Sequence, residues 1–237
     1  MAVTTTKRRK TSKANKFEII LKEAARLFCE KGYEATSLDD VADAVSIHKA
    51  TLYHYIQSKE EILYLCLLRS FEGYEQRLEE MKDTSVSVTD RLRRFFRTLI
   101  EAQNNEFGRC LCLVGRQPLG TESGEKILEF QRNMGFAVRR LLQEGIDDGS
   151  FKACDTRLAA NMIFGAFNSV PKWRRPDAGT STRQIAETYL DLFISGITAR
   201  PEAAKGGPPE EIQGEIQGKA RPAPRSGRRQ AGPRTRG

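Results

Sequence analysis

The side chains with the clearest chemical pattern lie in one short segment, residues 48–55. Leu52 and, just beyond the segment, Ile56 have the spacing of buried anchors on a short helix. A helix of barely two turns that carries hydrogen-bond donors on one face suits the major groove of DNA and its phosphates. The segment therefore predicts a DNA-reading element. Its remaining side chains include the donors Lys49, Thr51, Tyr53, His54 and Tyr55.

The residues before this segment have the signals of two helices that would hold it in place. Apolar residues recur at helical spacing from Phe17 to Phe28. Gly32 follows where a left-handed residue is needed to end that helix. Ser37 is placed to cap a second, shorter helix. Together with residues 48–55, these elements predict a helix-turn-helix and its support helix.

A longer helix is expected from Ser58 to about residue 82. Ser58 and Glu61 have the pattern of a capping box, and Lys59 lies at a helix N-terminus, where phosphate is favoured. Gly73 falls inside this helix and costs about 1 kcal/mol relative to alanine, so we expect a bend or close packing there. Further helices are expected over residues 88–105, 108–116, 121–148, 155–170 and 181–199, without any alternating strand pattern of useful length.

Residues 16–63 closely resemble the DNA-binding domain of the TetR family of bacterial transcriptional regulators. The resemblance implies an all-α fold, with an N-terminal three-helix helix-turn-helix domain and a C-terminal helical ligand-binding and dimerisation domain. It also implies a repressor rather than an activator. The motifs that carry the resemblance are Gly32-Tyr33, Thr36-Ser37, Val41-Ala42, Thr51-Leu52-Tyr53, Tyr55-Ile56 and Ser58-Lys59-Glu60-Glu61.

The positions expected to contact DNA follow from the segment and the resemblance together. For Tyr53 the alternative is packing against the first helix, and for His54 and Tyr55 it is a solvated surface or a spacer between helices. The expected DNA-binding residues are Thr36, Ser37, His48, Lys49, Ala50, Thr51, Tyr53, His54, Tyr55 and Lys59.

Three departures from the family pattern bear on base preference. Ser46 stands where the family has a turn glycine, so a positive φ there would carry strain. Ala50 replaces a second glycine and presents a methyl group toward the bases, and His48 replaces the usual serine cap. The docking mode therefore transfers from the family more readily than the operator sequence.

Composition divides the chain into two charged ends and a nearly neutral body. The formal net charge is +8, and residues 1–16 contribute six basic side chains and no acid. We expect residues 1–16 to be a basic disordered arm that lies on phosphates or enters a minor groove, with a solubilising leader as the alternative. The expected domains are the helix-turn-helix at 17–62, the helical ligand-binding and dimerisation domain at 63–199, and a disordered tail at 200–237, where apolar residues are too sparse to form a core.

The last two expected helices have more apolar surface than one neighbouring domain can cover. Residues 158–170 include only two strongly polar side chains, Asn161 and Asn168, and the final helix has a wide apolar face. The TetR resemblance implies that these two helices pair with those of a second copy in a four-helix bundle; a monomeric core is the alternative. A homodimer would place two reading helices about 34 Å apart, or a multiple of that, on a palindromic double-stranded DNA operator.

The segment 172–176, which joins these two helices, resembles a linker found in TetR-family regulators of fatty-acid and steroid catabolism. That resemblance implies a small-molecule effector, an acyl-CoA-like thioester, whose acidic groups would pair with arginines. Alternatively, Trp173 fills the dimer seam and the arginines are solvated. The residues expected to bind the effector are Phe96, Leu99, Arg109, Leu113, Met134, Phe167, Trp173 and Arg174.

Several other classes of protein are disfavoured by the residues present. Both histidines lie in the reading segment, and the five cysteines have no C-x-x-C pair. We therefore expect neither a metal site nor a cofactor, and we expect the cysteines to be reduced thiols. No Ser-His-acid set or phosphate-binding glycine loop can be assembled, so we expect no enzyme. Without a signal peptide or a membrane-spanning stretch, a cytoplasmic location is expected. A constitutive DNA-binding or architectural protein without a ligand remains the alternative function.

Overall fold

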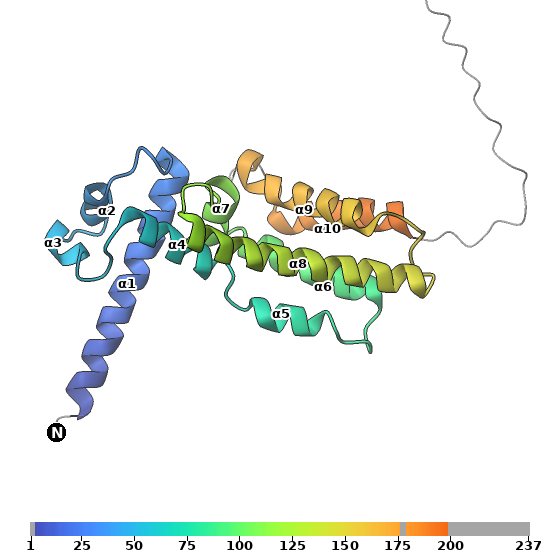
Figure 1. Cartoon of the computed structure of the whole chain (residues 1–237), viewed down its shortest axis with the longest axis horizontal. Coiled ribbons are helices and arrows are strands. Elements are labelled where there is room, and N and C mark those ends of the chain that lie inside the picture. The colour runs from blue at the N-terminus through green and yellow to red at the C-terminus, as the bar shows by residue number, and fades with distance from the viewer. Residues whose placement is uncertain (1–2, 176–178, 199–237) are drawn as a thin grey trace, which may run out of the picture. The chain divides into compact units, whose positions relative to one another are not determined.

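The computed structural model describes residues 3–175 and 179–198, with side chains from residue 14 onward. The expected tail at 200–237 lies outside the described residues. Within the described residues every regular element is a helix, which confirms the all-α prediction (Figure 1). The helices are α1 (Val3–Lys31), α2 (Leu38–Ala44), α3 (Lys49–Leu52), α4 (Lys59–Arg69), α5 (Tyr74–Glu80), α6 (Val88–Ala102), α7 (Glu106–Leu113), α8 (Thr121–Asp147), α9 (Thr156–Trp173) and α10 (Thr182–Ile197).

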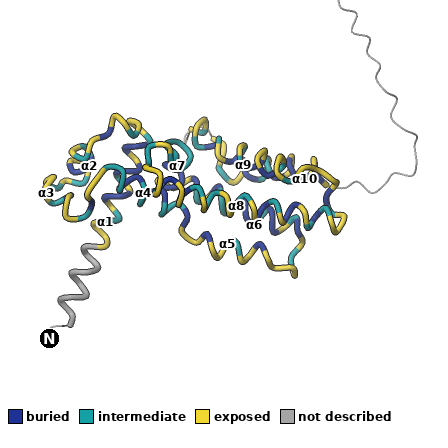
Figure 2. The backbone as a smooth tube through the Cα atoms, in the orientation of Figure 1, coloured by how far each residue is buried: buried dark blue, intermediate teal, exposed yellow. Residues whose placement is uncertain are grey.

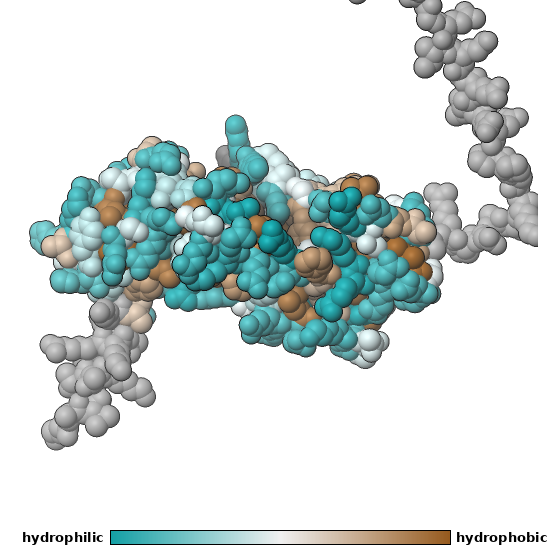
Figure 3. Space-filling model, in the orientation of Figure 1, coloured by the Kyte–Doolittle hydropathy of each residue, from teal (hydrophilic) through white to brown (hydrophobic). Residues whose placement is uncertain are grey.

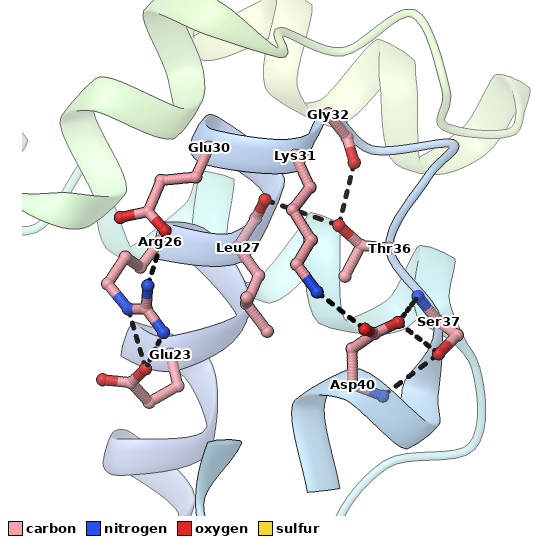
Figure 4. Close-up of polar contacts among 9 residues, drawn as sticks. All are labelled: Glu23, Arg26, Leu27, Glu30, Lys31, Gly32, Thr36, Ser37 and Asp40. Atoms are coloured by element: carbon pink, nitrogen blue, oxygen red, sulfur yellow. Dashed lines mark hydrogen bonds and ion pairs between the residues drawn. The ribbon is translucent and has the colours of Figure 1, made fainter. Parts of the chain in front are cut away.

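Helix α1 ends at the predicted glycine, and its end is tied to the start of α2. Gly32 adopts φ +90°, a conformation that favours glycine. The Thr36 hydroxyl donates to the Gly32 carbonyl at 2.8 Å, which satisfies a carbonyl that the end of the helix leaves free. Ser37 caps α2 and forms a capping box with Asp40, whose carboxylate also accepts from Lys31 at 2.7 Å (Figure 4). These contacts fix the angle between α1 and α2.

The start of α1 differs from our expectation for residues 1–16. The helix begins at Val3, so the segment expected to be a disordered arm is helical from that residue. The physical reason is that helix propagation adds one hydrogen bond for each residue fixed. The packed part of α1, which includes Ile20, Ala24 and Phe28, therefore nucleates a helix that can extend toward the N-terminus.

The single helix expected from Ser58 to residue 82 is wrong, because the chain forms two helices there. Helix α4 ends at Arg69 and α5 begins at Tyr74. Gly73 adopts φ +70° between them, so the residue that we expected to bend the helix interrupts it instead. The capping box is also incomplete: the Ser58 side chain accepts from the Glu61 amide, but the Glu61 carboxylate accepts from Gln57.

The body of the protein is a bundle in which α6 packs against α8 and α10, and α9 packs against α8 and α10. Its centre is aromatic: Phe96 lies 5.2 Å from Phe164 and 4.9 Å from Phe167, measured between ring centroids. Figure 2 shows buried residues on the facing sides of these helices. Helix α9 continues to Trp173, past Pro171, where we had expected it to end. A proline in the last turn leaves only one carbonyl without its helical partner.

Helix α7 joins the bundle to the helix-turn-helix. It packs against α1 and α4 on one side and against α9 on the other. Gly108 of α7 lies so close to the end of α6 that an added Cβ would be 2.1 Å from the Ala102 carbonyl oxygen. A displacement at the end of α6 would therefore reach α1 and α4 through direct packing.

Candidate functional site

The reading segment is anchored by its apolar residues and exposes its polar ones. Leu52 and Ile56 are buried against the support helices, as predicted. His48 begins α3 in an extended conformation without a side-chain cap, and Tyr53 is 47% exposed. The exposed side chains of the segment are His48, Lys49, Ala50, Tyr53 and His54, and Thr51 is half-buried. This is the arrangement that insertion into a major groove requires.

Two residues of the segment have partners within the domain. The Lys49 ammonium lies 2.9 Å from a carboxylate oxygen of Asp39 at the start of α2. Both side chains are more than half exposed, so water screens this pair and a phosphate can compete for the lysine. Tyr55 is half-buried and stacks on Phe17 of α1 at 6.5 Å between ring centroids. Its ring therefore supports the segment, which was the alternative interpretation for this tyrosine.

Three residues expected to contact DNA make hydrogen bonds within the protein. Thr36 is only 1% exposed and its hydroxyl donates to the end of α1. The Ser37 hydroxyl accepts from the Asp40 amide and donates to the Asp40 carboxylate, so its hydrogen-bonding capacity is used by the cap. The Lys59 ammonium donates to the Tyr33 carbonyl at 3.0 Å and lies over the Tyr33 ring at 4.3 Å. The sequence pattern could not show these intramolecular bonds, and the DNA contacts of these three residues stay a prediction.

Ser46 has the positive φ that its position requires. Its φ is +53°, and it is the one non-glycine residue with positive φ among the residues that the structure describes. An L-residue in this conformation is strained by about 1–2 kcal/mol because its Cβ approaches the carbonyl oxygen. The turn between α2 and α3 therefore keeps the family geometry without the family glycine.

A cavity of about 540 Å³, partly open to the surface, lies among the helices of the body. Helices α8 and α9 run antiparallel along it (Figure 1), and their lining residues extend from Leu128 to Arg139 and from Asn161 to Lys172. Each of these stretches spans about 16 Å at about 1.5 Å per residue. Ser70 and Phe71, in the turn that follows α4, also line the cavity. The cavity can therefore hold an elongated ligand that touches the helix leading to the DNA-reading segment.

The charged side chains that line the cavity are all basic. Within the described parts of the chain they are Arg77, Arg132, Arg139 and Lys172, and no Asp or Glu joins them. Arg132 has a partner outside the lining, Glu125 at 3.7 Å, and both of these side chains are more than half exposed. Burial lowers the pKa of Arg77, and the Nε of Arg139 has no hydrogen-bond partner among the described residues. Cations that are partly desolvated and incompletely paired favour an anionic ligand.

The apolar lining suits an acyl or ring group beside those charges. Phe71, Leu99, Leu111, Met134 and Phe164 contribute large apolar side chains from four helices and a turn. A surface that combines these residues with separate cations fits an amphiphile with an acidic group.

Of the eight residues expected to bind an effector, only Leu99 and Met134 line this cavity. Phe96 and Phe167 are fully buried in the aromatic centre of the bundle. Arg109 and Arg174 face a small separate void instead. Large apolar residues at helical spacing do not distinguish a core from a pocket wall, which is why sequence periodicity selected core residues.

Two further expected ligand residues also lie outside the lining. Leu113 is half-buried and is not among the residues that surround the cavity. Trp173 is 51% exposed, and its indole N–H donates to the Ser169 hydroxyl at 3.3 Å. Ser169 lines the cavity, so Trp173 contacts a residue of the cavity wall without lining the cavity itself. Of the lining cations absent from the expected set, Arg132 and Arg139 could have been found from their seven-residue spacing along one face of α8, whereas Arg77 and Lys172 have no such signal.

The helical body also exposes large apolar side chains. Leu158 and Met162 on α9 are 59% and 60% exposed, and Leu192 on α10 is 70% exposed. Apolar residues appear among polar ones on this part of the surface in Figure 3. No Cβ contact would form within 4 Å at Gly165 of α9 or Gly196 of α10, so both glycines leave open space on the surface. Exposed apolar residues with small residues between them favour contact with another helical surface.

Two further properties of the described residues concern membranes and metal ions. No helix in that part of the chain is long and apolar enough to cross a membrane. Nor do those residues contain a group of three or more His, Cys, Asp or Glu side chains that could hold a metal ion. All five cysteines are free thiols.

Comparisons with known proteins match both parts of the chain. Residues 20–64 match the family model described as bacterial regulatory proteins, tetR family, and residues 85–197 match the model described as tetracyclin repressor-like, C-terminal domain. The HTH-type transcriptional repressor KstR2 of Mycolicibacterium smegmatis is 26% identical over 190 residues, covering 78% of this chain and 92% of the relative.

Solved structures agree with the sequence comparisons. The TetR family transcriptional regulator PfmR from Thermus thermophilus is 34% identical with a TM-score of 0.67, covering 74% of this chain and 97% of that one. AibR in complex with isovaleryl coenzyme A and operator DNA is 25% identical with a TM-score of 0.68, covering 75% and 97%. The exposed reading segment, the all-helical body and these matches together show that this chain belongs to the TetR family of DNA-binding transcriptional regulators and is not an enzyme.

Proposed function

We propose that the protein is a homodimeric, cytoplasmic repressor that an acyl-coenzyme A thioester releases from a palindromic operator. The observation that carries this proposal is the cavity, whose described lining combines four basic side chains, no carboxylate and a large apolar wall. A thioester of coenzyme A offers phosphates for the cations and an acyl group for the apolar wall. That AibR has been crystallised with isovaleryl coenzyme A supports the same ligand class.

The structure offers a route from the cavity to DNA. Ser70 and Phe71 belong to the turn that follows α4, and they line the cavity. A ligand in the cavity would displace this turn and with it α4, which begins just after the reading segment. In a dimer built on the exposed surfaces of α9 and α10, the two reading segments would then no longer match two half-sites. The ligand must bind this DNA-incompetent state more tightly for release to occur.

The test is footprinting of the full chain on its own upstream intergenic DNA. Butyryl-, octanoyl- and lauroyl-coenzyme A are added in parallel with the corresponding free fatty acids. We expect a protected palindrome that a thioester releases and a free acid does not, because only the thioester brings phosphates to the cations. Protection that no thioester changes would favour the second candidate, a constitutive DNA-binding or architectural protein, and would refute the proposed ligand class.

A matched pair of variants tests the cavity itself. Arg139→Ala removes a cation that lines the cavity, whereas Arg140→Ala removes the exposed neighbouring cation on α8, outside this cavity. We expect Arg139→Ala to weaken thioester binding by about 10- to 100-fold, since a charge-assisted hydrogen bond contributes about 1.5–3 kcal/mol. Arg140→Ala should leave binding unchanged. Equal effects of the two variants would show that the cavity does not hold the ligand.

A further inference from the structure

Gln103 is the most deeply buried polar side chain along the cavity wall. It follows α6 directly and is only 5% exposed, yet it lines the cavity. Its Nε2 donates to the side-chain Oδ1 of Asn168 on α9 at 2.5 Å. Its Oε1 has no hydrogen-bond partner among the described residues. One end of this amide is thus held by the bundle while the other is unpaired.

An unpaired buried carbonyl oxygen is costly, and a bound donor would remove that cost. Leaving such a group without a partner costs about 1–3 kcal/mol. The terminal torsion of a glutamine side chain is soft, so a small rotation can bring Oε1 toward a ligand without moving the backbone. Asn168 is exposed and also lines the cavity, so it can follow this rotation. The favoured ligand group is an N–H or O–H donor.

The position of Gln103 connects this contact to the rest of the protein. Gly108 of α7 packs directly on its backbone: an added Cβ there would lie 2.6 Å from the Gln103 Cα. Helix α7 in turn packs against α1 and α4 of the DNA-binding domain. A ligand that binds Gln103 therefore touches the end of α6 where it meets the helix that supports the DNA-reading segment.

We propose that Gln103 is a specificity-determining residue that accepts a hydrogen bond from the bound effector. This inference rests on the proposed function, because it assumes a thioester in the cavity. Two parts of such a thioester could supply the donor: an amide N–H of the pantetheine arm, or a hydroxyl on the acyl group. The shared chemistry is a donor placed between the phosphates and the apolar end of the ligand.

The experiment compares wild type with Gln103→Met, which roughly keeps the length and volume of the side chain but removes the Oε1 acceptor together with the Nε2 donor to Asn168. Binding of butyryl-, octanoyl- and lauroyl-coenzyme A, and of their β-hydroxyacyl counterparts, is measured by calorimetry and by the fluorescence of Trp173, the single tryptophan. Gln143→Met is the matched control, because Gln143 lies on the exposed face of α8 and bonds only to Asp147 in the structure, at 2.8 Å.

The outcomes separate the two sources of the donor. A tenfold or greater loss of affinity for the saturated thioesters in Gln103→Met assigns the donor to the pantetheine arm. A loss confined to the hydroxylated thioesters assigns it to the acyl group. Unchanged affinity for both series, with the wild type binding, overturns this inference and leaves the proposed function intact. If the wild type binds no thioester, the proposed function fails and the inference fails with it.

The stability of the ligand-free variant gives a second, independent reading. Gln103→Met also loses the Nε2 hydrogen bond to Asn168, but removal of an unpaired buried Oε1 offsets that loss, so the variant should melt within about 2 °C of the wild type. A fall of more than about 6 °C exceeds what the loss of the single Nε2 hydrogen bond explains, and it would show that Oε1 already has a partner within the protein. That result would remove the structural basis of the inference.

Discussion

Gly108 offers the sharpest test of how α7 joins the bundle to the DNA-binding domain. In Gly108→Ala the new methyl carbon would lie 2.1 Å from the Ala102 carbonyl oxygen and 2.6 Å from the Gln103 Cα, where ordinary contact is 3.4–4 Å. Both neighbours are backbone atoms, so no side-chain rotation relieves the clash. Helix α7 would have to move away from the end of α6 by about 1 Å or more.

The expected cost follows from two opposing effects. Overpacking of this kind costs about 3 kcal/mol when backbone must shift. Alanine in place of glycine inside a helix gains about 1 kcal/mol. The net destabilisation is therefore about 2 kcal/mol, which corresponds to a fall in melting temperature of about 4–8 °C for a chain of this size.

The assay is urea unfolding and thermal melting followed by circular dichroism, without ligand or DNA. All variants are measured at one protein concentration, because the proposed dimerisation would make stability concentration-dependent. Gly135→Ala is the control: Gly135 lies in α8, and an added Cβ there would meet nothing within 4 Å. That variant should be more stable by about 1 kcal/mol. If Gly108→Ala is as stable as the wild type or gains as much as the control, the close packing of α7 on α6 is refuted.

Three smaller changes test the DNA-binding domain. Ser46→Gly should raise the free energy of unfolding by about 0.5 kcal/mol, measured from the urea midpoint, because the strain at φ +53° is relieved but the unfolded chain gains conformational freedom. A lower midpoint would contradict strain at Ser46. Hydrogen bonds from Lys31 and then Ser37 hold the pKa of Asp40 below its usual range. The contribution of Asp40 to stability is therefore present above pH about 4 and is lost as the pH falls through the lowered pKa. Asp40→Asn should flatten the loss of stability in acid, and an unchanged pH profile would refute this. Lys49→Ala should weaken binding to all DNA sequences equally, because a lysine on a phosphate does not read the bases. It should also reduce the slope of log affinity against log salt concentration by about 0.9 for each subunit bound. An unchanged slope would show that Lys49 stays paired with Asp39.

The helix boundaries were predictable because their signals are local. Ser37 and Ser58 cap α2 and α4 as predicted, and Gly32 ends α1 with a positive φ. Each of these effects involves only neighbouring residues. The break between α4 and α5 was not predicted, because a glycine inside an apolar pattern is compatible with both a bend and an end. The choice there depends on how Phe71 packs, and it stacks on Phe130 of α8 at 5.0 Å between ring centroids.

The functional sites show the same division. The exposed donors of residues 48–55 were predictable, because Leu52 and Ile56 alone decide which face is buried. The hydrogen bond from Lys59 to the Tyr33 carbonyl could not be predicted, because those residues are far apart in the sequence. The cavity wall was least predictable: Phe96 has the same helical spacing as a lining residue but lies in the aromatic centre.

By itself, the sequence determined the helical class, the helix-turn-helix domain and the family, because capping residues, helical periodicity and short motifs act over a few positions. The tertiary structure alone decided which large side chains fill the core and which surround a cavity. It also decided which cation on the cavity wall is incompletely paired, as for Arg139, and which buried amide oxygen stays unpaired, as for Gln103. Both depend on distances between helices that are remote in sequence, and no local pattern encodes those distances.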